Sequence, residues 1–258
     1  PLAALALVGA TPAQRALDGY VVTQRITSDA AQAMSMTMRV KVAQGRVRLE
    51  LDSPELAQMG PMYMLTRDDG KITAVLASQG MAIVMDASMV GGPAMGAFAP
   101  PTISDMAMTV DDLGAGERLL GYATRKYRVH ATYKMTTAAT GQSSYDSTME
   151  MFISTDVSAL AEGLQKFSDL FGGAFSGLAG GSSKELSAAM VAKTPKGYTL
   201  KAVIKSVETP ASGQPKNSTT TIEVSEIAKA SFEVSDFEVP AGMQVMDLAQ
   251  MMGGRGGR

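Results

Sequence analysis

The sequence predicts a mainly β protein with a minor α-helical part, and three observations lead to this class. From Met34 to Val42 apolar and polar residues alternate strictly, as in a strand with one buried and one solvated face. Two-residue turn signals such as Gln44-Gly45 separate several segments of this kind, which is typical of antiparallel hairpins. Between Val157 and Phe171 the apolar spacing changes to that of a helix.

The composition limits the possible functions. The 258 residues are 45% hydrophobic, enough for one sizeable core, and the formal net charge of -2 gives no reason to expect a nucleic-acid partner. With no cysteine, disulfides, thiol catalysis and thiolate metal sites are excluded. There are 20 methionines and no tryptophan. Methionine is flexible and polarisable, so a methionine-rich sheet face can adapt its shape.

Residues 1–16 are interpreted as the remnant of a secretory signal peptide. The apolar run over residues 1–10 is too short to span a bilayer, and the small residues after it resemble a cleavage zone. Cleavage is expected near Ala13 or Ala16, and a buried N-terminal helix is the alternative. The mature protein is therefore expected to be exported, to the periplasm or the extracellular space.

The first half of the mature chain is predicted to be a meander. Strands are expected at Tyr20–Ile26, Met34–Val42, Arg46–Leu51, Met62–Thr66, Ile72–Leu76 and Ala82–Met85. A two-residue turn at Gln44-Gly45 places Val42 opposite Val47 and Arg39 opposite Glu50, so both faces of this hairpin agree on one register. The segment Gly91–Thr102, rich in Gly, Pro and Ala, is predicted to be a long loop.

The second half is predicted to contain strands on either side of a helical segment. Strands are expected at Ala107–Val110, Gly121–Met135, Tyr145–Ile153, Tyr198–Val207 and Thr219–Ile227. Asp156 is a suitable N-cap for the helix over Val157–Phe171, and Ser182 and Glu185 have the spacing of a capping box for a short second helix. Residues 249–258 are expected to be a flexible Gly/Arg tail.

Several short motifs resemble a known family. They are Gly121-Tyr122-Ala123-Thr124-Arg125-Lys126-Tyr127-Arg128-Val129, Gly197-Tyr198-Thr199-Leu200-Lys201-Ala202, Phe232, and Phe237-Glu238-Val239-Pro240-Ala241-Gly242-Met243. Together they resemble the bacterial exported family domain of unknown function forty-four twelve (DUF4412), although Met243 stands where that family often has tyrosine. The layout is similar to the periplasmic lipoprotein carriers of the LolA and LolB type. The resemblance implies that residues 17–248 form one LolA-like domain, a highly curved antiparallel sheet wrapped as an unclosed barrel with one or two helices covering its open side.

The predicted function is non-catalytic binding or carriage of a hydrophobic ligand, a lipid or an acylated protein, in the bacterial cell envelope. A curved sheet with methionines on its concave face would accept acyl chains of varied shape, and the helix could cover them as a movable lid. The residues predicted to line the cavity are Met34, Met36, Met38, Met149, Met151, Leu164 and Phe167. The alternative is a structural or protein-interaction module whose sheet interior is a solid core without a ligand.

Catalytic and metal sites are not expected. Two sulfurs of a Met-x-Met pair on a strand lie about 7 Å apart, too far to share one Cu(I) ion without distortion. His130 is the one histidine and has no companion nucleophile motif in the sequence. We therefore predict no cofactor, no nucleic-acid partner, no membrane-spanning segment and at most transient membrane contact.

Overall fold

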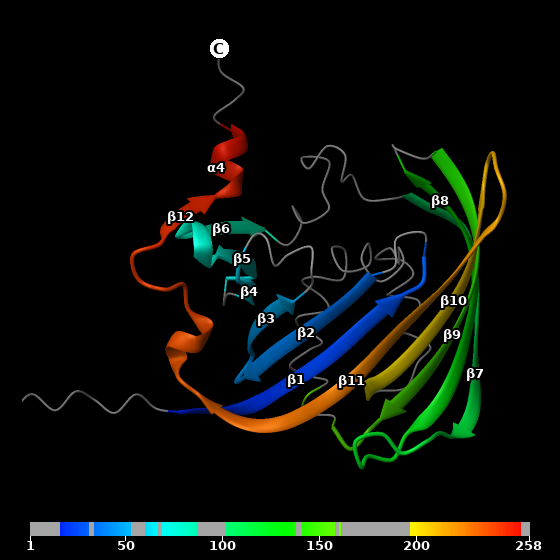
Figure 1. Ribbon diagram of the computed structural model, residues 1–258, viewed down its shortest axis with the longest axis horizontal. Coiled ribbons are helices and arrows are strands. Elements are labelled where there is room, and N and C mark those ends of the chain that lie inside the picture. Colours follow the sequence, from blue (N-terminus) through cyan, green and yellow to red (C-terminus); the bar gives the residue numbers. More distant parts are fainter. Residues whose placement is uncertain are drawn as a thin grey trace, which may run out of the picture.

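The computed structural model describes residues 16–30, 34–52, 60–66, 69–86, 102–137, 141–157, 160 and 197–253. Twelve strands form one sheet in the order β12-β6-β5-β4-β3-β2-β1-β11-β10-β9-β8-β7, and its two edges, β12 and β7, do not pair with each other (Figure 1). The sheet is strongly curved, with β6 and β12 at one end and β7 and β8 at the other (Figure 1). The predicted mainly β fold with a curved, unclosed sheet is confirmed.

The elements follow the chain in a simple order. They are β1 (Leu17–Ser28), β2 (Met34–Ala43), β3 (Arg46–Asp52), β4 (Met62–Thr66), β5 (Lys71–Leu76), η1 (Ala77–Gln79), β6 (Met81–Asp86), β7 (Thr102–Ala115), β8 (Arg125–Thr137), β9 (Gly141–Ser154), β10 (Tyr198–Pro210), β11 (Lys216–Phe232), η4 (Val234–Phe237), β12 (Gln244–Asp247) and α4 (Leu248–Gly253). We call β1–β6 with β12 the near half and β7–β11 the far half. They join where β1 pairs with β11.

The hairpin of β2 and β3 has the predicted register. Val42 lies opposite Val47 and Arg39 opposite Glu50. Both turn residues have positive φ, 48° at Gln44 and 80° at Gly45, as expected for the mirror-image turns that match strand twist. The ion pairs of Glu50 are formed with Lys41 (3.3 Å) and Arg48 (2.8 Å) on the same face.

Two strand predictions need correction. The strand expected from Gly121 begins at Arg125, because Leu120 (φ 51°) and Gly121 (φ 83°) form a turn closed by paired hydrogen bonds between Leu119 and Tyr122. The sheet is not wholly antiparallel either, since β12 pairs with β6 in parallel. That pair joins remote segments, and a four-residue strand has too short a pattern to reveal its partner.

The C-terminal strap, residues 233–247, packs on the outer face of the near half. Phe237 lies edge-on to Phe232, with 5.4 Å between the ring centroids, and both are buried beside Leu17 and Ala43. Further along, Val239 and Met243 pack on a cluster of Tyr63, Leu65, Val75 and Ala82. The strap thus buries apolar side chains on the outer face of the near half, next to the charged residues Lys41, Arg48 and Glu50.

Several predictions concern residues outside the described ranges. These include the signal interpretation of residues 1–15, the loop expected before Thr102, and the helices expected over Val157–Phe171 and after Ser182, of which Val157 and Leu160 alone are described. The start of the expected tail carries helix α4. No helix among the described residues is long and apolar enough to cross a bilayer.

Candidate functional site: the inner face of the curved sheet

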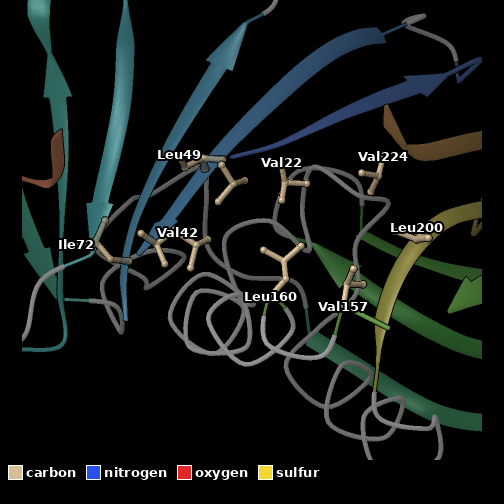
Figure 2. Packing of buried hydrophobic residues seen from close by; sticks show 10 residues of the cluster. Val22, Val42, Leu49, Ile72, Val157, Leu160, Leu200 and Val224 are labelled. Carbon is tan, nitrogen blue, oxygen red and sulfur yellow. The ribbon is translucent and has the colours of Figure 1, made fainter. Parts of the chain in front are cut away.

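The inner face of the sheet is the side toward which it curves. A cluster of buried side chains from β1, β2, β3, β5, β10 and β11 converges there on Val157 and Leu160 (Figure 2). A second cluster continues this face into the far half, with Tyr127, Val129, Met151, Ile153 and Ala202 as its buried members. The part of the inner face formed by these two clusters is therefore apolar and extends over both halves.

Methionines concentrate on this face. Among the methionines whose side chains are described in β2 to β9, every one except Met106 lies on the inner side of its strand; they are Met36, Met38, Met62, Met64, Met81, Met85, Met108, Met135, Met149 and Met151. Met106 lies in the bulge of β7 between Ser104 and Ala107. The strand pairing thus gathers methionines that are far apart in the sequence on one surface.

The structure places two of the methionines predicted to line a cavity on the same face of the sheet. The register connects Met36 through Ile26, Ile222 and Ala202 to Met151, so the two methionines belong to one row across β2, β1, β11, β10 and β9. Both are 4% exposed.

The other predicted lining residues have different environments. Met38 and Met149 are half-buried and pack against the first and second clusters respectively. The backbone of Met34 pairs with Ser28 at the end of β2. Leu164 and Phe167 lie outside the described residues.

Val157 and Leu160 fill part of the inner face. Leu160 is 1% exposed and lies among Val22, Val42 and Leu49 (Figure 2). These contacts belong to the segment that directly follows β9, so the chain turns inward as soon as that strand ends. The inner face near β1–β3 is therefore packed by the protein itself.

The inner face becomes polar toward the start of β9 and the end of β10. Ser147 and Ser206 share a hydrogen bond of 2.7 Å, and Ser143 donates to Glu208 Oε1 at 3.1 Å. The Tyr145 ring stacks on Tyr133 with 5.1 Å between centroids. Burial, followed by the charge of the hydrogen-bonded Glu208, raises the pKa of Tyr145 to about 12, so its hydroxyl stays protonated and donates.

The sequence interpretation missed this polar end. Ser143, Tyr145 and Ser147 continue the two-residue spacing of Met149 and Met151, so alternation alone places all of them on one face. Glu208 lies just beyond the predicted end of its strand, which extends to Pro210. If the alternation of the two predicted strands had been continued to Ser143 and to Glu208, both residues would have been placed on the inner face.

A family assignment rests on most of the chain. The sequence matches the family described as Domain of unknown function (DUF4412) over residues 19–243. The chain belongs to the DUF4412 family. No curated protein matches this DUF4412 chain. The matched region runs from Gly19 in β1 to Met243, just before β12, so it covers most of β1 and all of β2–β11.

The outer face of the far half in this DUF4412 chain carries charged side chains. Glu150 contacts Lys126 at 2.8 Å and Arg128 at 2.9 Å, and these hydrogen bonds hold the pKa of Glu150 below its ordinary value. His130 Nε2 lies 2.9 Å from Asp146 Oδ1 and is exposed. Within the described part of the chain, no three His, Asp or Glu side chains are grouped so that they could hold a metal ion. A solvated ladder of ion pairs accounts for this face.

Proposed function

We propose that this protein binds or carries a hydrophobic molecule, a lipid or the acyl chain of an acylated protein, in the bacterial cell envelope, without catalysing a reaction. The observation that carries the proposal is the gathering of methionines on the inner face. Ten of the eleven methionines whose side chains are described in β2–β9 lie there, and Met106 is the exception.

Methionine suits a surface that holds more than one shape. Its side chain has three rotatable bonds and a polarisable sulfur, so it repacks around acyl chains of different length. A core that requires one fixed arrangement favours branched side chains, and the cluster around Leu160 has that composition, with valine, leucine and isoleucine as its buried members. Met149 and Met38 are half-buried and pack against the two clusters of the inner face, so a ligand can contact the part of each side chain that is still exposed.

The alternative is a structural or protein-interaction module with a solid interior. The burial of Val157 and Leu160 against Val22 and Leu49 favours this reading for the inner face near β1–β3. A carrier would hold a ligand on the inner face of the far half, whereas a solid-core module would not. The two functions therefore predict different masses for the purified protein.

The decisive experiment is native mass spectrometry of the protein purified from its host, followed by organic extraction and lipid analysis. A carrier is expected to retain a lipid or acyl compound in a one-to-one ratio, which the extraction identifies. If the mass equals that of the chain alone, and stays so after incubation with vesicles of mixed envelope lipids, the solid-core module is the correct function.

A further inference from the structure

The inner face of the far half has a gradient of polarity along its strands. The pairing of β8, β9, β10 and β11 arranges the side chains in rows about 7 Å apart, since two residues separate neighbours on one face. The successive rows are Tyr127-Met151-Ala202-Ile222, Val129-Met149-Ile204-Thr220, Ala131-Ser147-Ser206-Ser218 and Tyr133-Tyr145-Glu208-Lys216. Three strands, β9, β10 and β11, change from apolar to polar at nearly the same level, whereas β8 stays apolar with buried Ala131 and Tyr133.

The last row places opposite charges side by side. Glu208 is half-buried, and its carboxylate accepts hydrogen bonds from Ser143 and Tyr145. Lys216 lies directly opposite Glu208 in register and is exposed. Both residues are described, and no ion pair within 4.0 Å joins their side chains. Ser147, Ser206 and Ser218 lie between the charged row and the row that contains Met149.

We infer that the inner face of the far half binds a zwitterionic phospholipid with a primary ammonium group, its acyl chains against half-buried Met149 and Ile204, its ammonium at Glu208 and its phosphate at Lys216. This inference rests on the proposed function, of which it specifies the ligand. An amphiphile needs an apolar surface that ends in a polar one, and the order of the four rows supplies it.

The chemistry of the polar rows fits this head group. A carboxylate has about four acceptor positions, so Glu208 can accept from an ammonium in addition to Ser143 and Tyr145. Because the Tyr145 hydroxyl remains protonated, it fixes the carboxylate and does not compete with it for the ligand's charge. A lysine ammonium is a compact cation that pairs well with phosphate. The serines can hydrogen-bond the oxygens that link the phosphate to the acyl chains.

The test compares two lipids that differ in the head group alone. The full chain is incubated with vesicles containing equal amounts of phosphatidylethanolamine and phosphatidylglycerol with identical acyl chains, and the lipid bound to the recovered protein is quantified. We expect phosphatidylethanolamine to be preferred about tenfold, the value of one charge-assisted hydrogen bond. Glu208→Gln should reduce this ratio to about one or two, because the amide keeps the contacts with Ser143 and Tyr145 but loses the charge.

Two further variants separate the parts of the proposal. Lys216→Gln should lower the binding of both lipids about equally, since both contain the phosphate. Glu223→Gln, on the outer face of the same sheet, should leave ratio and amount unchanged. A ratio near one in the unmodified protein, or a preference that survives Glu208→Gln, overturns this inference while the carrier function stands. If no lipid binds at all, both fail. Equal urea midpoints for the variants confirm that the fold is intact.

Discussion

The two halves of the sheet are buried in different ways. In the near half, fully buried side chains lie on both faces: Leu49 and Ile72 on the inner side, and Val75 and Ala82 on the outer side under the C-terminal strap. In the far half, β8 and β9 alternate between buried apolar residues inside and charged residues outside. The near half thus has buried apolar residues on both faces, beside the ion-paired Lys41, Arg48 and Glu50 on its outer side, whereas the far half buries them mainly on its inner face.

This difference separates stability from binding. A strand buried on both faces has little freedom to change, because every side chain fills space shared with a neighbour. A strand solvated on one face can receive a ligand on the other without exposing a second core. We therefore expect substitutions in the near half to unfold the protein and substitutions on the inner face of the far half to alter ligand binding.

The largest effect is expected in the near half. Leu49→Ala should lower the free energy of unfolding by roughly 3–5 kcal/mol, because Leu49 is 0% exposed and the removed side chain leaves a cavity. Urea unfolding followed by circular dichroism measures this loss. Leu113→Ala is the matched control in the far half, where Leu113 is 41% exposed, and should cost less than about 0.5 kcal/mol. Similar losses of unfolding free energy for Leu49→Ala and Leu113→Ala would contradict the greater contribution to stability that we assign to the near half.

The strap should contribute the next largest effect. Phe237→Ala removes the ring that packs edge-on against Phe232 and should cost about 3 kcal/mol. Arg48 also holds the strap, since it lies 3.7 Å above the Tyr63 ring and donates to the Asp236 carbonyl oxygen at 3.1 Å. Urea unfolding again provides the measurement, with Val234→Ala as a partly buried control. A loss below about 1 kcal/mol for Phe237→Ala would mean that the strap adds little to the core.

Met149→Gln should separate binding from stability. The substitution nearly preserves the volume of a half-buried side chain, so it should cost less than about 1.5 kcal/mol, while the lipid retained through purification falls at least about twofold. Thr148→Gln places the same side chain on the outer face of the same strand and should leave the lipid unchanged. A large loss of stability with no change in lipid would favour the solid-core module.

The smallest effect is expected in the outer ion pairs. Glu150→Gln should cost about 0.2–1 kcal/mol at low salt and less at high salt, because exposed pairs are weak and screened. The pKa of Glu150 is lowered from 4.5 in the folded state, so its contribution is complete above that value and is lost as the pH falls through the lowered pKa. Unfolding midpoints at pH 7 and pH 3 should therefore differ less for Glu150→Gln than for the unmodified protein. An equal difference would show that Lys126 and Arg128 do not stabilise this carboxylate.

Strand pairing was predicted accurately from the sequence where two strands follow each other directly and a short turn sets their register. The β2–β3 register followed from alternation and a two-residue turn, both of which are local. The pairing of β1 with β11 and of β12 with β6 depends on segments distant in the chain, and no local pattern specifies it. Local alternation was enough to predict Met36 and Met151 as site residues. That they lie in one row follows from the pairing of β1 with β11, which the sequence does not specify. Glu208 was not predicted as a site residue because the predicted lining residues were all apolar, and the polar residues further along the same strands were not included.

The junction of the two halves has a consequence for how the protein is made. Thr23 on β1 hydrogen-bonds Glu226 on β11, a partner 203 positions further along the chain. During synthesis β1 therefore lacks this neighbour until nearly the whole polypeptide has left the ribosome, and contacts of such long range form slowly. Until then the sheet has an unfinished edge and an uncovered apolar face. Late closure thus leaves the apolar inner face of the unfinished sheet open to wrong contacts for most of the synthesis.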